Sequence, residues 1–155
     1  MKRTMIALAL VAAVGGGSAA TATAAPDRGT GRPLTTTLTP DQEVAPFAGI
    51  KGASGSFSAR LNPGRGLICV DLTTEGVDLV LAHIHEGPAG TNGPVLFDFS
   101  ALVDPESGTA AGCLAADRAL IKEIIANPSD YYVNVHEGVP PTAGFFQGVR
   151  GQLGR

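Results

Sequence analysis

Short segments in which apolar and polar residues alternate run through most of this chain and predict β-strands. Residues 54–61 (SGSFSARL) carry apolar side chains at alternate positions, and 67–73 (LICVDLT) resumes after Asn62-Pro63-Gly64, a strong turn sequence. We therefore expect a β-hairpin over 54–73. Further short strands are predicted at 35–39, 80–85, 95–99, 109–114, 131–135 and 145–153.

Only one segment has the spacing of a helix. Apolar residues in 117–127 (DRALIKEIIAN) fall on one helical face, Asp117 is suited to cap the start, and Pro128 ends the pattern. We interpret it as a helix that packs on the core. About eight short strands and one helix predict an all-β fold, an antiparallel Greek-key-like β-sandwich or flattened barrel.

The first 24 residues have the pattern of a secretory signal peptide. Lys2 and Arg3 precede an apolar run over 5–14, which is too short for the roughly 20 residues that span a bilayer. Small residues follow and predict cleavage near Ala24-Ala25. Residues 25–33, polar and broken by Gly and Pro, predict a flexible leader, and 34–155 predict one domain of a secreted, extracellular protein.

Composition and charge narrow the classes of partner. All 14 acidic residues but only nine of the 11 Lys and Arg follow the predicted cleavage site, which leaves a mature net charge of −5. No basic cluster is present, so we expect neither nucleic acid nor an anionic membrane as partner. The 21 Gly and 11 Pro agree with a turn-rich chain of short strands, which we expect to be a monomer.

The two cysteines, Cys69 and Cys113, are expected to form a disulfide. In an oxidising compartment two thiols in one small domain are usually paired, and their spacing lacks the C-x-x-C pattern of redox or metal sites. A bond closing a loop of about 45 residues would contribute roughly 4 kcal/mol through the entropy of the unfolded chain.

The three histidines have a spacing that predicts a metal site. His83 and His85 are two residues apart in a strand and therefore project from one face, opposite Ile84. In 131–136 (YYVNVH) the same period places Asn134 and His136 opposite the valines. If the two strands are neighbours, three imidazoles converge under the glycine-rich loop 87–94 and suit a copper or zinc ion.

A structural role for the histidines remains an alternative. Each ring could instead hydrogen-bond to loop backbone, for example in 87–94. Glu86 and Glu137 directly follow histidines, but in an extended chain each points away from the neighbouring ring, so we expect both carboxylates to be solvated.

Five motifs in order resemble the chordin-type (CHRD) domain. The resemblance covers about Leu34 to Leu153 and implies an extracellular module with a poorly defined biochemical role. The loop 137–144 (EGVPPTAG) departs from the shorter connection usual in that family. The motifs are Leu38 with Gln42-Glu43-Val44 and Pro46; the Gly/Ser-rich strand 52–58; Ala82-His83-Ile84-His85 with Gly87-Pro88; Tyr132-Val133-Asn134-Val135-His136; and Arg150-Gly151-Gln152-Leu153.

The strand His83-Ile84-His85-Glu86 also resembles, more weakly, the His-x-His strand of copper/zinc superoxide dismutase. The further histidines and the aspartate of that two-metal site are missing, so the similarity leaves a mononuclear site only. The motifs of nucleotide-binding proteins and of serine or cysteine hydrolases are absent too.

Three functions remain as hypotheses. The first is a non-catalytic secreted module that binds a protein or cell-surface ligand through its loops. The second is an extracytoplasmic copper- or zinc-binding protein that uses His83, His85 and His136. The third is a small metal-dependent enzyme, for which no catalytic residues can be named.

Overall fold

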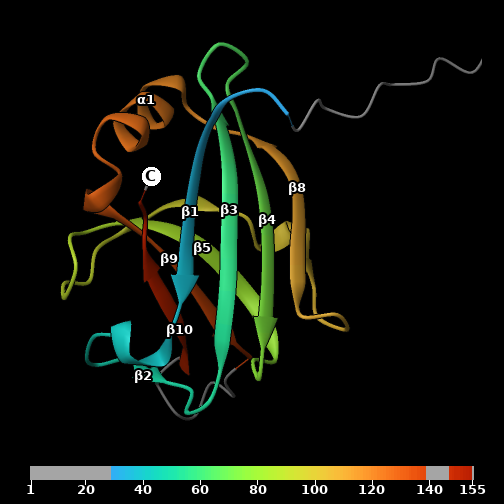
Figure 1. Ribbon diagram of the computed structural model, residues 1–155, viewed down its shortest axis with the longest axis vertical. Coiled ribbons are helices and arrows are strands. Elements are labelled where there is room, and N and C mark those ends of the chain that lie inside the picture. Colours follow the sequence, from blue (N-terminus) through green and yellow to red (C-terminus); the bar gives the residue numbers. More distant parts are fainter. Residues whose placement is uncertain (1–28, 139–146, 155) are drawn as a thin grey trace, which may run out of the picture.

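The described part of the chain forms a β-sandwich. In the computed structural model residues 29–138 and 147–154 are described, so the predicted signal peptide, residues 25–28 of the predicted leader and Phe145-Phe146 lie outside them. Two five-stranded sheets face each other, and sheet B crosses obliquely behind sheet A (Figure 1). The expected all-β fold is confirmed. The described strands do not close into a barrel, so the sandwich is the architecture observed.

Sheet A is antiparallel and contains the predicted hairpin. Asn62 faces Leu67 across the hairpin turn, and its side-chain oxygen accepts a hydrogen bond from the Arg65 N–H at 3.0 Å. Gly66 completes the turn with a φ of +66°, which favours glycine. In spatial order the strands are β1 (Arg32–Leu38), β3 (Ser54–Asn62), β4 (Leu67–Glu75), β8 (Thr109–Ala115) and β7 (Val103–Asp104).

Sheet B contains both histidine-bearing strands. In spatial order it comprises β2 (Ala48–Gly49), β10 (Gln147–Gln152), β9 (Tyr131–Glu137), β5 (Leu79–Glu86) and β6 (Val95–Asp98). The expected antiparallel pairing holds except between β2 and β10, which run parallel. The two-residue strands β2 and β7 account for the excess over the eight strands expected.

The core lies between the sheets and follows the alternation in the sequence. Every second side chain of β3 and β4 points inward and is buried. The side chains between them lie on the outer face of sheet A. The core side of sheet B is equally apolar, as predicted from Ile84 and the two valines of β9. Among the buried residues are Phe57, Leu61, Leu72, Ile84, Phe99, Val133, Val135 and Val149.

The one α-helix among the described residues is the predicted one. Helix α1 (Arg118–Ala126) begins after Asp117, whose Oδ1 accepts hydrogen bonds from the N–H groups of Ala119 and Leu120 at 2.7 and 3.0 Å. Ile121 and Ile124 point into the core, so the helix covers one end of the sandwich (Figure 1). Within the described ranges no helix is long and apolar enough to cross a bilayer. Short 3-10 helices in the described part of the chain are η1 (Pro40–Gln42), η2 (Ser100–Leu102) and η3 (Pro128–Asp130).

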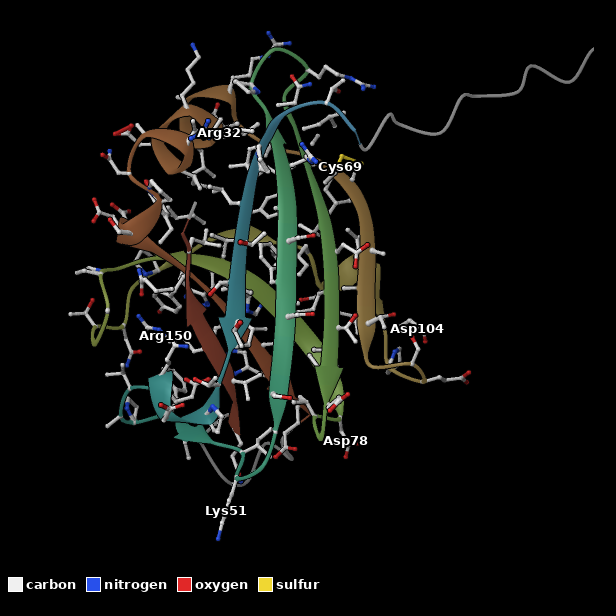
Figure 2. The ribbon with its side chains drawn as sticks, in the orientation of Figure 1. Arg32, Lys51, Cys69, Asp78, Asp104 and Arg150 are labelled. Atoms are coloured by element: carbon white, nitrogen blue, oxygen red, sulfur yellow. A yellow bond between two sulfur atoms is a disulfide. The ribbon has the colours of Figure 1, made fainter. Side chains whose placement is uncertain are left out.

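The expected disulfide between Cys69 and Cys113 is confirmed. The two residues are 44 positions apart in sequence and face each other on neighbouring strands β4 and β8. Because Ile68 and Val70 on either side of Cys69 are the core residues of β4, the bond lies on the outer face of sheet A (Figure 2). It therefore joins two strands that the hydrogen-bond ladder already holds side by side.

Candidate metal site

The outer face of sheet B is buried along β9 and partly buried at the histidines of β5. The alternation in the sequence predicts only that this face differs from the core face. All residues of β9 from Tyr131 to His136 are buried, on both faces. Two segments, residues 40–47 and 87–94, cover this face, and we call them the covering segments. They meet where the Asn92 side-chain amide donates to the carbonyl oxygens of Val44 and Ala45 at 3.2 and 2.9 Å. A polar layer is therefore enclosed beneath them.

The three histidines meet in this layer. Strands β5 and β9 are direct neighbours, with His83 opposite Asn134 and His136 opposite Leu81. One ring nitrogen from each of His83, His85 and His136 can be chosen so that all three lie within 4.8 Å of one another. A metal bound at 2.0–2.1 Å would hold its ligand nitrogens about 3.4 Å apart, so a pair 4.8 Å apart would have to close by about 1.4 Å. That adjustment is within reach of small side-chain rotations.

A hydrogen bond to the backbone determines which ring nitrogen of His85 carries the hydrogen. Its Nδ1 lies 3.0 Å from the carbonyl oxygen of Gly93, and because a carbonyl can only accept, Nδ1 carries the hydrogen. The other nitrogen, Nε2, is buried and has no hydrogen-bond partner. Gly93 is fixed in turn, since its N–H donates to the Tyr132 hydroxyl at 3.1 Å and a Cβ there would collide with the carbonyl of Glu86. Backbone–histidine bonds of this kind orient many metal-bound imidazoles.

His83 is arranged in a comparable way. Its Nε2 lies 3.7 Å from the Asp98 carboxylate at the edge of the sheet, while Nδ1 is buried without a partner. Burial lowers the pKa of His83 more than Asp98 raises it, so the ring is neutral at pH 7 and the contact is not an ion pair. A buried nitrogen left without a partner typically costs about 1–3 kcal/mol.

Burial keeps all three rings neutral. It lowers the pKa of His136 to about 4, with a smaller contribution from repulsion by His83 and His85. For His85 burial is again the main cause of a lowered pKa, against the opposing bond to Gly93. Neutral imidazole is the form that binds metals, so protons compete little for these nitrogens at neutral pH.

Tyr132 and Arg150 hold the covering segment 87–94 onto the site. The Arg150 guanidinium lies 3.4 Å above the centre of the Tyr132 ring, and the His85 ring stacks on Tyr132 at 4.8 Å. Arg150 is almost completely buried and donates to the Thr91 carbonyl at 2.8 Å. It makes longer contacts to Asn92 Oδ1, Pro88 O and Gln152 Oε1.

Glu43 is the unexpected member of the polar layer. It lies in the covering segment 40–47, where its Oε2 accepts a 3.4 Å hydrogen bond from the Asn134 amide. Its other oxygen, Oε1, is buried without a partner, as is Asn134 Oδ1. Burial raises the pKa of Glu43 to about 7, against the lowering effects of Asn134 and Arg150.

Sequence reasoning identified the three histidines but not the residues that surround them. The signal for the others was present in the motifs: Glu43, Tyr132, Asn134 and Arg150 all belong to stretches on which the CHRD resemblance rests. Glu86 is exposed as expected and Glu137 is partly exposed.

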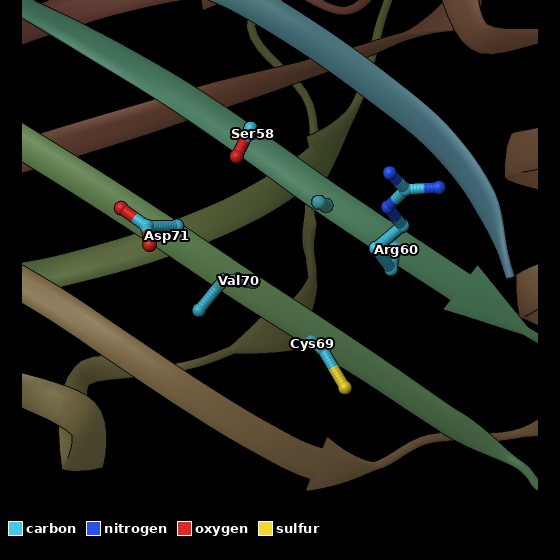
Figure 3. A pocket seen from close by; sticks show the side chains of 6 residues that line it. Ser58, Arg60, Cys69, Val70 and Asp71 are labelled. Atoms are coloured by element: carbon cyan, nitrogen blue, oxygen red, sulfur yellow. The ribbon is translucent and has the colours of Figure 1, made fainter. Parts of the chain in front are cut away.

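The remaining hollows do not combine with the histidines. A shallow pocket of about 160 Å³ lies on the outer face of sheet A, where Ser58 and Arg60 of β3 lie beside Cys69 and Asp71 of β4 (Figure 3). A larger one of about 460 Å³ lies between β6, the end of β8 and the start of α1. Neither contains a cluster of ligating groups. The polar layer beneath the covering segments is therefore the candidate site.

Fold and site together define a disulfide-linked β-sandwich with a cluster of three histidines, of which His136 is buried and His83 and His85 are partly buried. Comparison with known families assigns it further: the family model of the CHRD domain matches residues 34–153, so the chain belongs to the CHRD domain family. No curated protein and no solved structure matches the chain. CHRD domains are generally non-enzymatic binding modules, and both the family and the disulfide are compatible with an extracellular location.

Proposed function

We propose that this chain is an exported, non-catalytic CHRD module that binds one copper or zinc ion through His83, His85 and His136. The observation that carries the proposal is the convergence of three ring nitrogens within 4.8 Å in a buried layer. Imidazole suits both ions, and three such ligands leave one position of a tetrahedral ion for a further group.

The local hydrogen bonds support binding over a purely structural role. A structural histidine would use both ring nitrogens or expose one to water, yet His83 Nδ1 and His85 Nε2 are buried without partners. Binding an ion would give both atoms a partner. Export is supported by the pattern of residues 1–24 and by the disulfide, which forms in oxidising compartments. Recognition of a protein or cell-surface ligand stays a prediction.

Metal analysis of the exported protein tests the proposal. The mature chain is produced by export to an oxidising compartment, stripped with a chelator and titrated with Zn²⁺ and Cu²⁺, with calorimetry and thermal unfolding as readouts. We expect one ion per chain and a raised unfolding temperature; at 100 times the dissociation constant, the ion adds about 2.7 kcal/mol.

Variants then locate the ion. His83→Ala and His136→Ala should each lose tight binding. Glu86→Gln is the matched control, because Glu86 directly follows His85 but is exposed, and it should bind as the wild type does. Equal metal content in the wild type and both histidine variants would refute the site.

A further inference from the structure

Glu43 borders the histidine cluster from the segment that covers it. Three histidines leave one coordination position open, and the outer face of sheet B is sealed from solvent at β9 by the covering segments. The chain itself must therefore supply the remaining group or leave room for a small molecule. Glu43 belongs to the segment that forms the cover.

The backbone fixes Glu43 over the sheet. Its N–H donates to the Pro40 carbonyl, which ends the short helix η1. On one side of it Gln42 Oε1 accepts from the Gln152 N–H at 3.1 Å, and on the other Val44 is bonded to Asn92. The residues on either side of Glu43 are therefore both held, Gln42 by β10 and Val44 by the covering segment 87–94.

The carboxylate approaches His136 across a gap that only a glycine leaves open. A Cβ built on Gly148 would lie 3.2 Å from Glu43 Oε1 and 3.2 Å from His136 Nδ1, so these two atoms are separated by at most twice that distance. The same Cβ would collide with the carbonyl of Val135. Gly148 therefore provides the space in which a carboxylate oxygen and an imidazole nitrogen come together.

Charge also favours an ion at this place. Glu43 Oε1 is buried without a hydrogen-bond partner, and Arg150, whose charge acts on Glu43, directs its guanidinium to the carbonyl of Thr91. An ionised carboxylate in such a position is costly unless a cation lies beside it. A divalent ion held by neutral imidazoles would be that cation.

Glu43 also has room to move. It is not one of the three residues whose ligand atoms lie within 4.8 Å of one another, so it must turn toward the ion. Its other side lines a cavity of about 160 Å³ between the covering segments, together with Asp41, Gly90 and Gln152. Because the backbone is fixed and the side chain borders free space, rotation about its own torsions suffices.

We infer that Glu43 is the fourth ligand, so that the site is a closed three-histidine, one-carboxylate centre. The inference rests on the proposed metal-binding function. It excludes an open position for substrate and is consistent with a non-catalytic, closed site, since structural zinc sites are four-coordinate with protein ligands.

Glu43→Gln tests the assignment, because glutamine keeps the size and can still accept from Asn134 but is a poor metal ligand. We expect the affinity for Zn²⁺ to fall by about 10- to 100-fold or more, the range seen when even outer groups of metal sites are changed. In the Co²⁺-loaded protein, the intense visible absorption of a four-coordinate ion should change in the variant. Asp41→Asn is the control: this carboxylate lines the same cavity, is exposed, and should leave both readouts unchanged.

The outcomes separate this inference from the proposed function. If Glu43→Gln binds Zn²⁺ as tightly as the wild type while His136→Ala does not, the three-histidine site stands and Glu43 is not a ligand. A weaker affinity with an unchanged Co²⁺ spectrum would make Glu43 a positioning residue and overturn the assignment. Failure of the wild-type chain to bind any ion would overturn both.

Discussion

Replacing Arg150 by lysine tests whether the guanidinium holds the covering segment 87–94 onto sheet B. Arg150 is 1% exposed and binds through a planar fork, with one nitrogen on Thr91 O and the other directed to Pro88 O. Lysine keeps the positive charge, but its compact ammonium group can reach only one of the two carbonyl oxygens. It also lacks the planar group that stacks on Tyr132.

The expected loss follows from these contacts. A hydrogen bond from a charged donor contributes about 1.5–3 kcal/mol, and we count one as lost because lysine can serve only one of the two sides of the fork. Weaker cation–π stacking removes roughly another 0.5–1 kcal/mol. Arg150→Lys should therefore lower the free energy of unfolding by about 2–4 kcal/mol, which for a domain of this size is on the order of 10 °C in Tm.

Two measurements check this result. Thermal unfolding gives the size of the loss, and amide hydrogen exchange shows its location. The N–H groups of Thr91 and Gly93, bonded to Pro88 O and Tyr132 Oη, should exchange faster, whereas those of the β3–β4 hairpin should not change. Arg60→Lys, on the exposed side of β3, is the control and should stay within about 0.5 kcal/mol of the wild type. If Arg150→Lys also stays within about 0.5 kcal/mol of the wild type and the amides of 87–94 exchange at the wild-type rate, the guanidinium does not hold this segment.

Three further outcomes are expected. Replacing Cys69 and Cys113 together by alanine should lower the free energy of unfolding by about 4 kcal/mol in urea titrations, since the bond closes a loop of 44 residues; a loss below 1 kcal/mol would contradict the entropic account. Asp117→Ala should cost about 1 kcal/mol in thermal unfolding by removing two hydrogen bonds at the start of α1, and an unchanged Tm would argue against the cap. In chelator, the wild type should lose more stability than His136→Asn as pH falls from 6.5 to about 4. In this window the unfolded chain binds a proton that the folded His136 does not, so equal pH profiles would disprove the lowered pKa.

Much of the fold was predictable because its signals are local. The hairpin over 54–73 follows from alternation around one turn, and α1 follows from its spacing and from Asp117 at the start. The shared face of His83 and His85 needed only the two-residue period of a strand. Their meeting with His136 depended on one non-local fact, that β5 and β9 are neighbours.

The surroundings of the histidines could not be predicted in this way. Alternation in 131–136 distinguishes two faces but does not reveal that both are buried. The cover comes from segments distant in sequence: Glu43 meets Asn134 across 91 positions, and Arg150 reaches Thr91 across 59. Contacts of this separation leave no periodic signal, so the residues appeared only as parts of family motifs without a role.

The contact between the end of β1 and β10 has a consequence for how the chain folds. Thr39 and Arg150 exchange two backbone hydrogen bonds, at 2.9 and 3.2 Å, so the end of β1 is joined directly to β10. β10 also fills the position between β2 and β9 in sheet B. If the chain is exported as proposed and emerges N-terminus first, sheet B lacks the strand between β2 and β9 until residues 147–152 have emerged. Sheet A can assemble before that point, whereas the covering segment 87–94 gains its hydrogen bond from Arg150 only when β10 arrives. A chain arrested before residues 147–154 emerge should therefore be more open to proteases than the complete domain.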